Sequence, residues 1–203
     1  MSPFIHVNCA MSADGKIAGP DRKQMRISSE EDMVRVRDLR KEYDSILVGV
    51  GTVISDNPHL TVKGLSYDDN PVRIVIDPHG RTPDDALVLD ERAPTVMVTS
   101  SSCDREWDAE EIVRAGDPLD LNIMLEALED MGIDSILVEG GGETIAGFFR
   151  AGLVNKYTVF VGSCVIGGRT SPTPADGDLA ILKKMTLESS EILGSGVLLT
   201  FTL

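Results

Sequence analysis

The residues with the clearest chemical potential follow a short apolar run in the last third of the chain. Glu139 is succeeded by Gly140, Gly141 and Gly142, and a helical pattern begins at once. Glycines let the backbone approach a ligand closely, and a helix N-terminus offers N–H groups to a phosphate. The arrangement predicts a site for a phosphorylated small molecule such as a nucleotide. The alternative is a turn that needs glycine for structural reasons alone. The spacing is not that of the dinucleotide fingerprint, because Ile145 stands where its third glycine belongs.

A second polar turn follows the first apolar run, where Asp14 and Lys16 flank Gly15. Asp-Gly is a common turn signal, so a purely structural turn is the simpler interpretation. Asp14, Lys16 and Glu139 are nevertheless the candidates to supply or steady a proton.

Several common enzyme classes lack their motifs in this chain. No Gly-x-Ser-x-Gly motif is present, and no Gly-x-x-x-x-Gly-Lys-Ser/Thr loop, which argues against acyl transfer and against an NTPase. The 3 histidines and 3 cysteines show no ligand spacing, so no metal site is expected.

Composition narrows the possible partners. The 203 residues are 42% hydrophobic and 26% charged, which is typical of a globular protein, and we expect a single domain over residues 1–203. The formal net charge of −14 argues against nucleic acid and against an anionic membrane surface. No apolar run is long enough to span a bilayer and the start resembles no signal peptide, so a cytoplasmic location is expected.

Alternating strands and helices are expected to position these residues. A Ser cap followed by acids predicts the start of a helix over residues 29–42, in which Met33, Val36 and Leu39 keep helical spacing. Other helices are expected over 120–131 and from the glycine turn to 151. Strands are expected at 4–10, 45–50, 72–77, 94–99, 112–113, 135–138, 156–161, 187–193 and 197–202.

This order predicts an α/β fold with a mostly parallel sheet and helices on both faces. The turn at 194–196 predicts an antiparallel hairpin at the C-terminus, so the sheet is mixed. Three strand ends, at Gly49–Asp56, Ser100–Ser102 and Glu139–Glu143, carry polar or flexible residues and are expected to line one cleft. Arg40 is placed where it can reach a ligand phosphate.

Several motifs, taken in order, resemble one known family, the riboflavin-biosynthesis reductases. The motifs are Asn8-x-Ala10-x-Ser12-x-Asp14-Gly15-Lys16, Gly49-Val50-Gly51-Thr52 with Asp56-x-Pro58-x-Leu60, Asn70-Pro71-Val72-Arg73, Val138-Glu139-Gly140-Gly141-Gly142 and Ile166-Gly167-Gly168. The resemblance runs from about residue 4 to 203. The zinc signature of the deaminase that is fused to some members is absent.

The resemblance implies a dihydrofolate-reductase-like fold, a homodimer and NADPH as cofactor, with NADH as a possible substitute. It implies reduction of the ribosylamino group of 2,5-diamino-6-ribosylamino-4(3H)-pyrimidinone 5′-phosphate to a ribitylamino group. The cofactor carries such chemistry, which fits a chain without a strong nucleophile or metal motif.

The resemblance also implies roles for individual residues. The cofactor would be held by Thr52, Asp56, Gly140, Gly141, Gly142 and Glu143. The substrate would be held by Asn8, Ser28, Arg40, Leu60 and Lys63, of which the last three correspond to positions near its phosphate. Catalytic roles would fall to Glu139, Asp14 and Asn8. An acid at position 143 is unfavourable beside a pyrophosphate, so we expect Glu143 to turn outward and serve the helix N-terminus instead.

Two other functions remain open at this point. A pterin or folate reductase of the same fold is one, although Arg40 and Lys63 count against it because those substrates lack a ribose 5′-phosphate. A non-catalytic nucleotide-binding module is the other, and it would bind NADPH without oxidising it.

Overall fold

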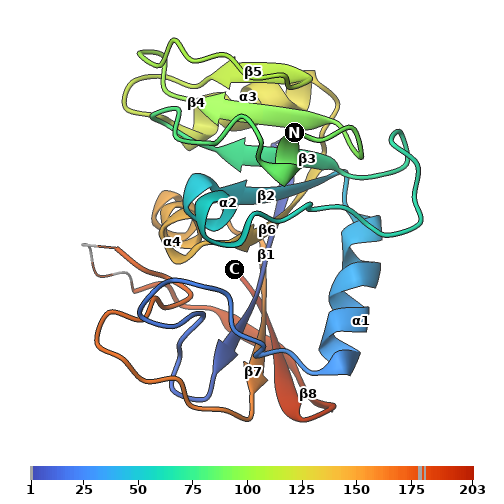
Figure 1. The fold of residues 1–203 in the computed structure, drawn as a ribbon. Helices are drawn as coiled ribbons and strands as arrows, with labels where there is room; N and C mark the ends of the chain where they lie inside the picture. Colours follow the sequence, from blue (N-terminus) through green and yellow to red (C-terminus); the bar gives the residue numbers. More distant parts are fainter. Residues whose placement is uncertain (1, 178–179, 181) are drawn as a thin grey trace. The chain divides into compact units, whose positions relative to one another are not determined.

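The computed structural model describes residues 2–177, 180 and 182–203 (Figure 1). Four helices occur along these residues: α1 (Glu30–Leu39), α2 (Val50–Asp56), α3 (Leu121–Asp130) and α4 (Gly142–Ala151), with single turns η1 (Arg40–Glu42) and η2 (Leu87–Leu89). The strands are β1 (Phe4–Ser12), β2 (Ser45–Gly49), β3 (Val72–Ile76), β4 (Thr95–Thr99), β5 (Glu111–Arg114), β6 (Ser135–Gly140), β7 (Lys156–Gly162), β8 (Thr186–Leu193) and β9 (Gly196–Thr202).

All nine of these strands belong to one mixed sheet. The chain divides into two compact units: unit 1 comprises Met1–Phe4 and Arg40–Leu137, and unit 2 comprises Ile5–Leu39 and Val138–Leu203. Strand β6 crosses the division between these ranges. The expectation of a single domain therefore stays a prediction.

Unit 1 is built on four parallel strands in the order β5-β4-β3-β2. Strands β2 and β4 are buried along their whole length, as parallel strands between helices require, whereas β5 is largely exposed and β3 includes the buried Arg73. Figure 1 shows α2 in front of these strands and α3 behind them. One face carries a core cluster of Ile46, Val48, Val53, Leu60, Val75, Ala86, Val88, Met97 and Trp107.

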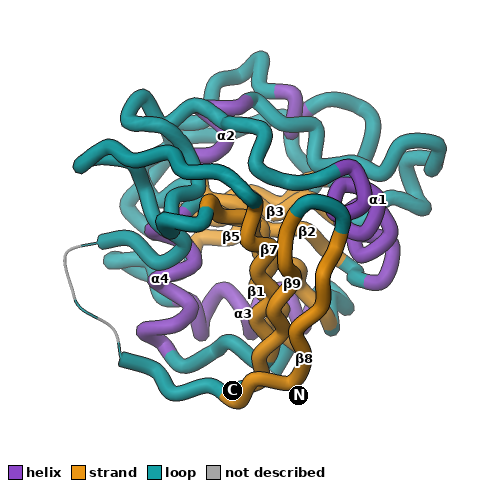
Figure 2. The backbone as a smooth tube through the Cα atoms, turned by 90° about the horizontal axis from the view of Figure 1, so that it is seen from below, coloured by secondary structure: helices purple, strands orange, loops and turns teal. Residues whose placement is uncertain are grey.

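Unit 2 carries strands in the order β1-β7-β9-β8, with β1 and β7 parallel and the other two pairs antiparallel. The expected C-terminal hairpin is confirmed as β8–β9, which runs beside β7 in Figure 2. On one face Asn8 of β1 contacts Arg35 of α1, and on the other Tyr157 of β7 meets Phe149 of α4 edge-on at 5.4 Å. Helices thus cover both faces of the strands in unit 2.

Helix α1 begins as the sequence predicted but presents a different side to its sheet. The Ser29 hydroxyl accepts the Asp32 N–H at 3.2 Å, which confirms the Ser cap. The apolar spacing suggested that Met33 would be buried, yet its side chain is 54% exposed and Asp32 is 1% exposed. The reason is that β1 offers a polar partner on this face, Asn8, so the helix buries a charged pair of side chains. Among the helices described, none combines the length and apolarity that crossing a bilayer requires.

Candidate functional site

The predicted glycine turn joins β6 to α4 within a few residues. Gly140 has φ 141°, which favours glycine, and Gly141 is the N-cap of α4 without any capping side chain. A Cβ on Gly142 would collide with the carbonyl oxygen of Thr173 and lie 2.9 Å from the Cβ of Asp176. The Asp176 N–H also donates to the Gly142 oxygen at 3.1 Å. Only glycine fits where the 173–176 segment closes on the start of α4.

The start of α4 is suited to an anionic group. The first N–H groups of a helix lack intrahelical acceptors, and the helix dipole adds positive charge there. Glu143 lies in this first turn, but its side chain is 74% exposed and its Oε1 is 3.7 Å from Nη1 of Arg22. Glu143 therefore turns outward as expected, and its role at the helix N-terminus stays a prediction. Glu139 is half-buried, one residue before the end of β6.

A buried polar chain links β1 to α1 in unit 2. The Oδ1 atom of Asn8 accepts a hydrogen bond from Nη2 of Arg35 at 2.8 Å, and Nε of Arg35 donates to Oδ1 of Asp32 at 2.8 Å. Because arginine only donates, Asn8 must turn its oxygen toward Arg35 and offer its Nδ2 hydrogens elsewhere. Sequence reasoning missed Asp32 and Arg35, since charged residues on a helix usually form a solvated face.

The Asp14 carboxylate is hydrogen-bonded both to Ser12 and to the loop at residues 166–167. It accepts hydrogen bonds from the Ser12 hydroxyl at 2.5 Å, the Ile166 N–H at 3.0 Å and the Gly167 N–H at 2.8 Å. These bonds, that from Ser12 first, lower the pKa of Asp14 to about 2. The neighbouring Lys16 donates from Nζ to the Ser171 oxygen at 3.0 Å. An ionised, fully engaged carboxylate suits a positioning role, and direct catalysis by Asp14 stays a prediction.

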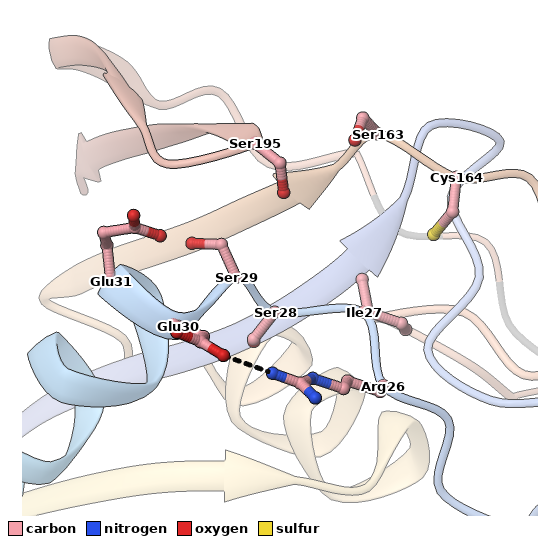
Figure 3. Close-up of a pocket in the computed structure, with 9 residues that line it drawn as sticks. All are labelled: Arg26, Ile27, Ser28, Ser29, Glu30, Glu31, Ser163, Cys164 and Ser195. Atoms are coloured by element: carbon pink, nitrogen blue, oxygen red, sulfur yellow. Dashed lines mark hydrogen bonds and ion pairs between the residues drawn. The ribbon is translucent and has the colours of Figure 1, made fainter.

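Ser28 lines a polar cavity of about 460 Å³ in unit 2. Figure 3 shows the segment before α1 along one side of this cavity and Ser163 and Ser195 along another. Arg26 and Glu30 form an ion pair at 3.3 Å at its edge. The complete lining consists of Arg26, Ile27, Ser28, Ser29, Glu30, Glu31, Ser163, Cys164 and Ser195.

A second cavity, of about 620 Å³, lies in unit 1 and brings together Arg40, Leu60 and Lys63. These are the three residues that the resemblance assigned to a substrate phosphate. Nη1 of Arg40 donates to the Thr61 oxygen at 3.4 Å, so the guanidinium is held beside the cavity wall. The lining consists of Arg40, Pro58, His59, Leu60, Thr61, Val62, Lys63, Gly64, Leu65, Tyr67, Asn70, Glu91 and Arg92, and we call this space the Arg40 cavity.

The wall of the Arg40 cavity contains a strained residue. Leu60 has φ 51° although it is a bulky L-residue, and its side chain is buried in the core cluster. Such a backbone costs about 1–3 kcal/mol and occurs mostly at functional sites. The loop is held by Asn70, whose Oδ1 accepts the Val62 N–H at 2.8 Å and whose Nδ2 donates to the Ser66 oxygen at 2.7 Å.

The remaining predicted cofactor residues lie on α2, where Thr52 and Asp56 are half-buried. Because β2, β3 and β4 are parallel, the strand ends at Gly49–Asp56 and Ser100–Ser102 share one edge within unit 1, as expected. The third strand end, at Glu139–Glu143, belongs to unit 2, and its place in a common cleft stays a prediction. In the part of the chain described, no group of three or more His, Cys, Asp or Glu side chains is placed to hold a metal ion.

The buried side chain of His6, in strand β1 of unit 2, makes the free energy of unfolding depend on pH. This side chain is 2% exposed, and its Nε2 lies 2.6 Å from Oγ1 of Thr158. Burial first, and then the charges of Lys156 and Arg35, lower the pKa of His6 from 6.5 to about 4. Between these values the unfolded chain binds a proton that the folded chain does not. The free energy of unfolding therefore decreases by about 3 kcal/mol as pH falls from 7 to 4.

Urea unfolding at pH 7 and at pH 4 measures this dependence. The His6→Gln variant should lose about 3 kcal/mol less than the natural chain over that interval. Equal losses in the two proteins would show that His6 is not the group responsible.

The chain is similar in sequence and in structure to known proteins. A family model described as the RibD C-terminal domain matches residues 3–199. The 2,5-diamino-6-ribosylamino-4(3H)-pyrimidinone 5′-phosphate reductases of Archaeoglobus fulgidus and Methanothermobacter thermautotrophicus are each 39% identical to this chain. The two alignments cover 98% and 100% of this chain, and 98% and 99% of those proteins, respectively.

A crystal structure of a diaminohydroxyphosphoribosylaminopyrimidine deaminase/5-amino-6-(5-phosphoribosylamino)uracil reductase from Thermotoga maritima is similar over 99% of this chain, with TM-score 0.83 at 26% identity. This chain spans 56% of that longer one. The predicted fold class, a dihydrofolate-reductase-like mixed sheet that is mostly parallel, is confirmed.

Proposed function

This chain belongs to the RibD C-terminal domain family and is a reductase, and from that premise we propose which reaction it catalyses. The reaction is the NADPH-dependent reduction of the ribosylamino group of 2,5-diamino-6-ribosylamino-4(3H)-pyrimidinone 5′-phosphate to the ribitylamino product, a step of riboflavin biosynthesis. The observation that carries the proposal is the 39% identity, over nearly the whole chain, to two reductases named for this substrate.

The lining of the Arg40 cavity supports the proposal that the substrate carries a phosphate group. Its volume of about 620 Å³ falls in the range of small-molecule sites. It gathers Arg40 and Lys63 on a chain of net charge −14, where an anionic ligand needs local cations to overcome the overall field. A pterin or folate would leave these cations without a phosphate partner, which disfavours that alternative.

A nicotinamide cofactor follows from membership of this reductase family, and we assign NADPH as that cofactor. The fit rests on the start of α4, where the N-cap is Gly141 and no capping side chain takes up the free N–H groups. Within unit 2 the proposed cofactor residues are Gly140–Glu143, and the cofactor roles of Thr52 and Asp56, which belong to unit 1, stay predictions. When bound, the cofactor would supply a hydride.

The proposed chemistry requires the protein mainly to position the two ligands and to transfer protons to the substrate. The sugar ring opens when the bond between C1′ and the ring oxygen breaks, the ring oxygen takes up a proton, and the exocyclic nitrogen gives up its proton to form a double bond to C1′. After hydride addition to C1′, that nitrogen needs one proton. Asn8, turned by Arg35, would donate a hydrogen bond to a substrate acceptor, and Glu139 would carry or orient the proton. Asp14 would keep the 166–167 loop in place.

An absorbance assay of NADPH oxidation tests this function with three candidate substrates. We expect oxidation with the ribosylaminopyrimidine 5′-phosphate, much slower oxidation with its dephosphorylated form, and none with dihydrofolate. Oxidation by dihydrofolate alone would favour the pterin or folate reductase. NADPH binding without oxidation by any of the three would favour the non-catalytic module.

The same assay tests the assignment of Glu139. The Glu139→Gln variant keeps the size of the side chain and removes its ability to carry a proton. We expect turnover to fall by about a hundredfold or more, as for loss of a general acid–base group, while NADPH affinity changes little. Unchanged turnover would remove Glu139 from the proton path.

We also assign a homodimer and a cytoplasmic location. Strand β8 lies at the edge of the sheet and is exposed along nearly its whole length, with Leu187 55% and Ile192 85% exposed. Exposed apolar edges of this kind usually pair or become covered. Light scattering should give the mass of two chains, and a monomer would contradict the assignment.

The three thiols that form no disulfide favour a reducing compartment, and cell fractionation would test the cytoplasmic location.

A further inference from the structure

One cation of the Arg40 cavity, Arg92, was not marked by any sequence motif. Its Nε lies 3.2 Å from Oδ2 of Asp90, and its Nη1 lies 3.2 Å from Nε2 of His59. The other ring nitrogen of His59, Nδ1, lies 3.0 Å from the same Asp90 oxygen. Since arginine only donates, Nε2 of His59 accepts, and Nδ1 carries the hydrogen that bonds Asp90. Asp90 and His59 therefore hold the guanidinium of Arg92 along one side.

Asp90 is itself fixed from the interior of unit 1. Arg73 is 1% exposed, and its Nη1 donates to Oδ1 of Asp90 at 2.8 Å while its Nη2 donates to the Asp90 backbone oxygen at 2.6 Å. Nη1 of Arg73 also reaches the backbone oxygens of Leu87 at 3.1 Å and His59 at 3.4 Å. The segment before β4 and the loop around Leu60 are thus tied to one buried guanidinium. A surface arginine anchored in this way needs little ordering when a ligand binds.

The charges around the cavity favour a doubly charged ligand. Arg40, Lys63 and Arg92 contribute three positive charges, and Glu91 contributes one negative charge. With His59 neutral, as its bonding pattern indicates, the lining carries a net charge of +2. A phosphate monoester carries between about −1.5 and −2 at neutral pH. Without Arg92 the lining would carry only +1, so Arg92 completes the charge match.

We propose that Arg92 is a third cationic ligand of a phosphate monoester in the Arg40 cavity, with Asp90 and His59 as its positioning residues. The identity of the monoester as the substrate's ribose 5′-phosphate rests on the proposed function. The same chemistry occurs in the adenosine 2′-phosphate group of NADPH, so the test separates the two sources.

Calorimetric binding of two probes, ribose 5-phosphate and adenosine 2′-monophosphate, gives the test without any turnover. The proteins are the natural chain, Arg92→Ala, Arg92→Lys, Lys63→Ala and the control Arg114→Ala. Arg114 is a matched control because it pairs with Glu106 at 2.6 Å outside this cavity. We expect Arg92→Ala and Lys63→Ala each to weaken ribose 5-phosphate binding by about tenfold, the size expected for one charge-assisted hydrogen bond. Arg114→Ala should change neither probe's affinity.

The lysine variant separates charge from orientation. Arg92→Lys keeps the charge but cannot contact Asp90 and His59 through two separate nitrogens, so its affinity should lie between those of the natural chain and Arg92→Ala. A lysine variant that binds as tightly as the natural chain would overturn the positioning role of Asp90 and His59.

Two results would overturn the role of Arg92 itself. One is unchanged ribose 5-phosphate affinity in Arg92→Ala while Lys63→Ala weakens it. The other is weakening of adenosine 2′-monophosphate alone, which would move the residue to the cofactor. Failure of the natural chain to bind ribose 5-phosphate would remove the phosphate from this cavity altogether. If ribose 5-phosphate binds through Arg92 but NADPH is never oxidised, the proposed function fails and the assignment of Arg92 as a phosphate ligand stands.

Discussion

Alanine at position 142 is expected to weaken NADPH binding by about tenfold to a hundredfold, corresponding to an overpacking cost of about 1–3 kcal/mol. The added Cβ would collide with the Thr173 oxygen and with the side chain of Asp176. Either the 173–176 segment or the first turn of α4 must move, and the N–H groups that we assign to the cofactor move with that turn. Calorimetric NADPH titration of Gly142→Ala measures the effect.

The control for this variant is binding of ribose 5-phosphate. The Arg40 cavity belongs to unit 1, whereas Gly142 belongs to unit 2, so affinity for that probe should stay the same if the variant is folded. NADPH affinity equal to that of the natural chain would show that the glycine turn does not hold the cofactor.

Replacing Arg73 with methionine is expected to lower the free energy of unfolding by about 3–5 kcal/mol, as when one partner of a buried ion pair is removed. Asp90 would lose its buried cation and keep only the exposed Arg92, and the backbone oxygens of Leu87 and Ala93 would each lose the hydrogen bond from Arg73. Urea unfolding followed by circular dichroism measures the difference.

The Arg114→Met variant provides the comparison for this measurement. Arg114 also pairs with an acid, Glu106, but both side chains are partly or largely exposed. Exposed pairs contribute about 0–1 kcal/mol, so this variant should lose little stability. Similar losses in the two variants would show that the Arg73 network does not support unit 1 as described.

The strongly patterned elements of the fold could be predicted from local sequence. Strands β2, β3 and β4 are runs of β-branched and aliphatic residues, and their limits were predicted to within one residue. The Gly152 C-cap, with φ 72°, and the hairpin turn at Gly194–Gly196 are set by residues next to each other in the chain. Local signals of this kind need no knowledge of the tertiary partners.

The parts that escaped prediction depend on partners distant in sequence. Asp32 is buried with Arg35 as its partner, and Arg35 in turn bonds Asn8, which lies 27 positions away in the sequence. Arg73 sits within an apolar strand, and its role becomes visible only when residues 59–93 fold around it. Arg92 belongs to no motif, so only the cavity singles it out. Lys63 and Arg40, by contrast, were marked by the family resemblance and do line one cavity.

In the proposed reaction a hydride passes from NADPH to C1′ of the ribosylamino group. NADPH deuterated at the transferable C4 position tests this transfer, with the ribosylaminopyrimidine 5′-phosphate as substrate and the product analysed by mass spectrometry and NMR. We expect one deuterium per product molecule, bound to C1′ of the ribityl chain. A product without deuterium, or with deuterium on the pyrimidine ring, would rule out the proposed hydride transfer.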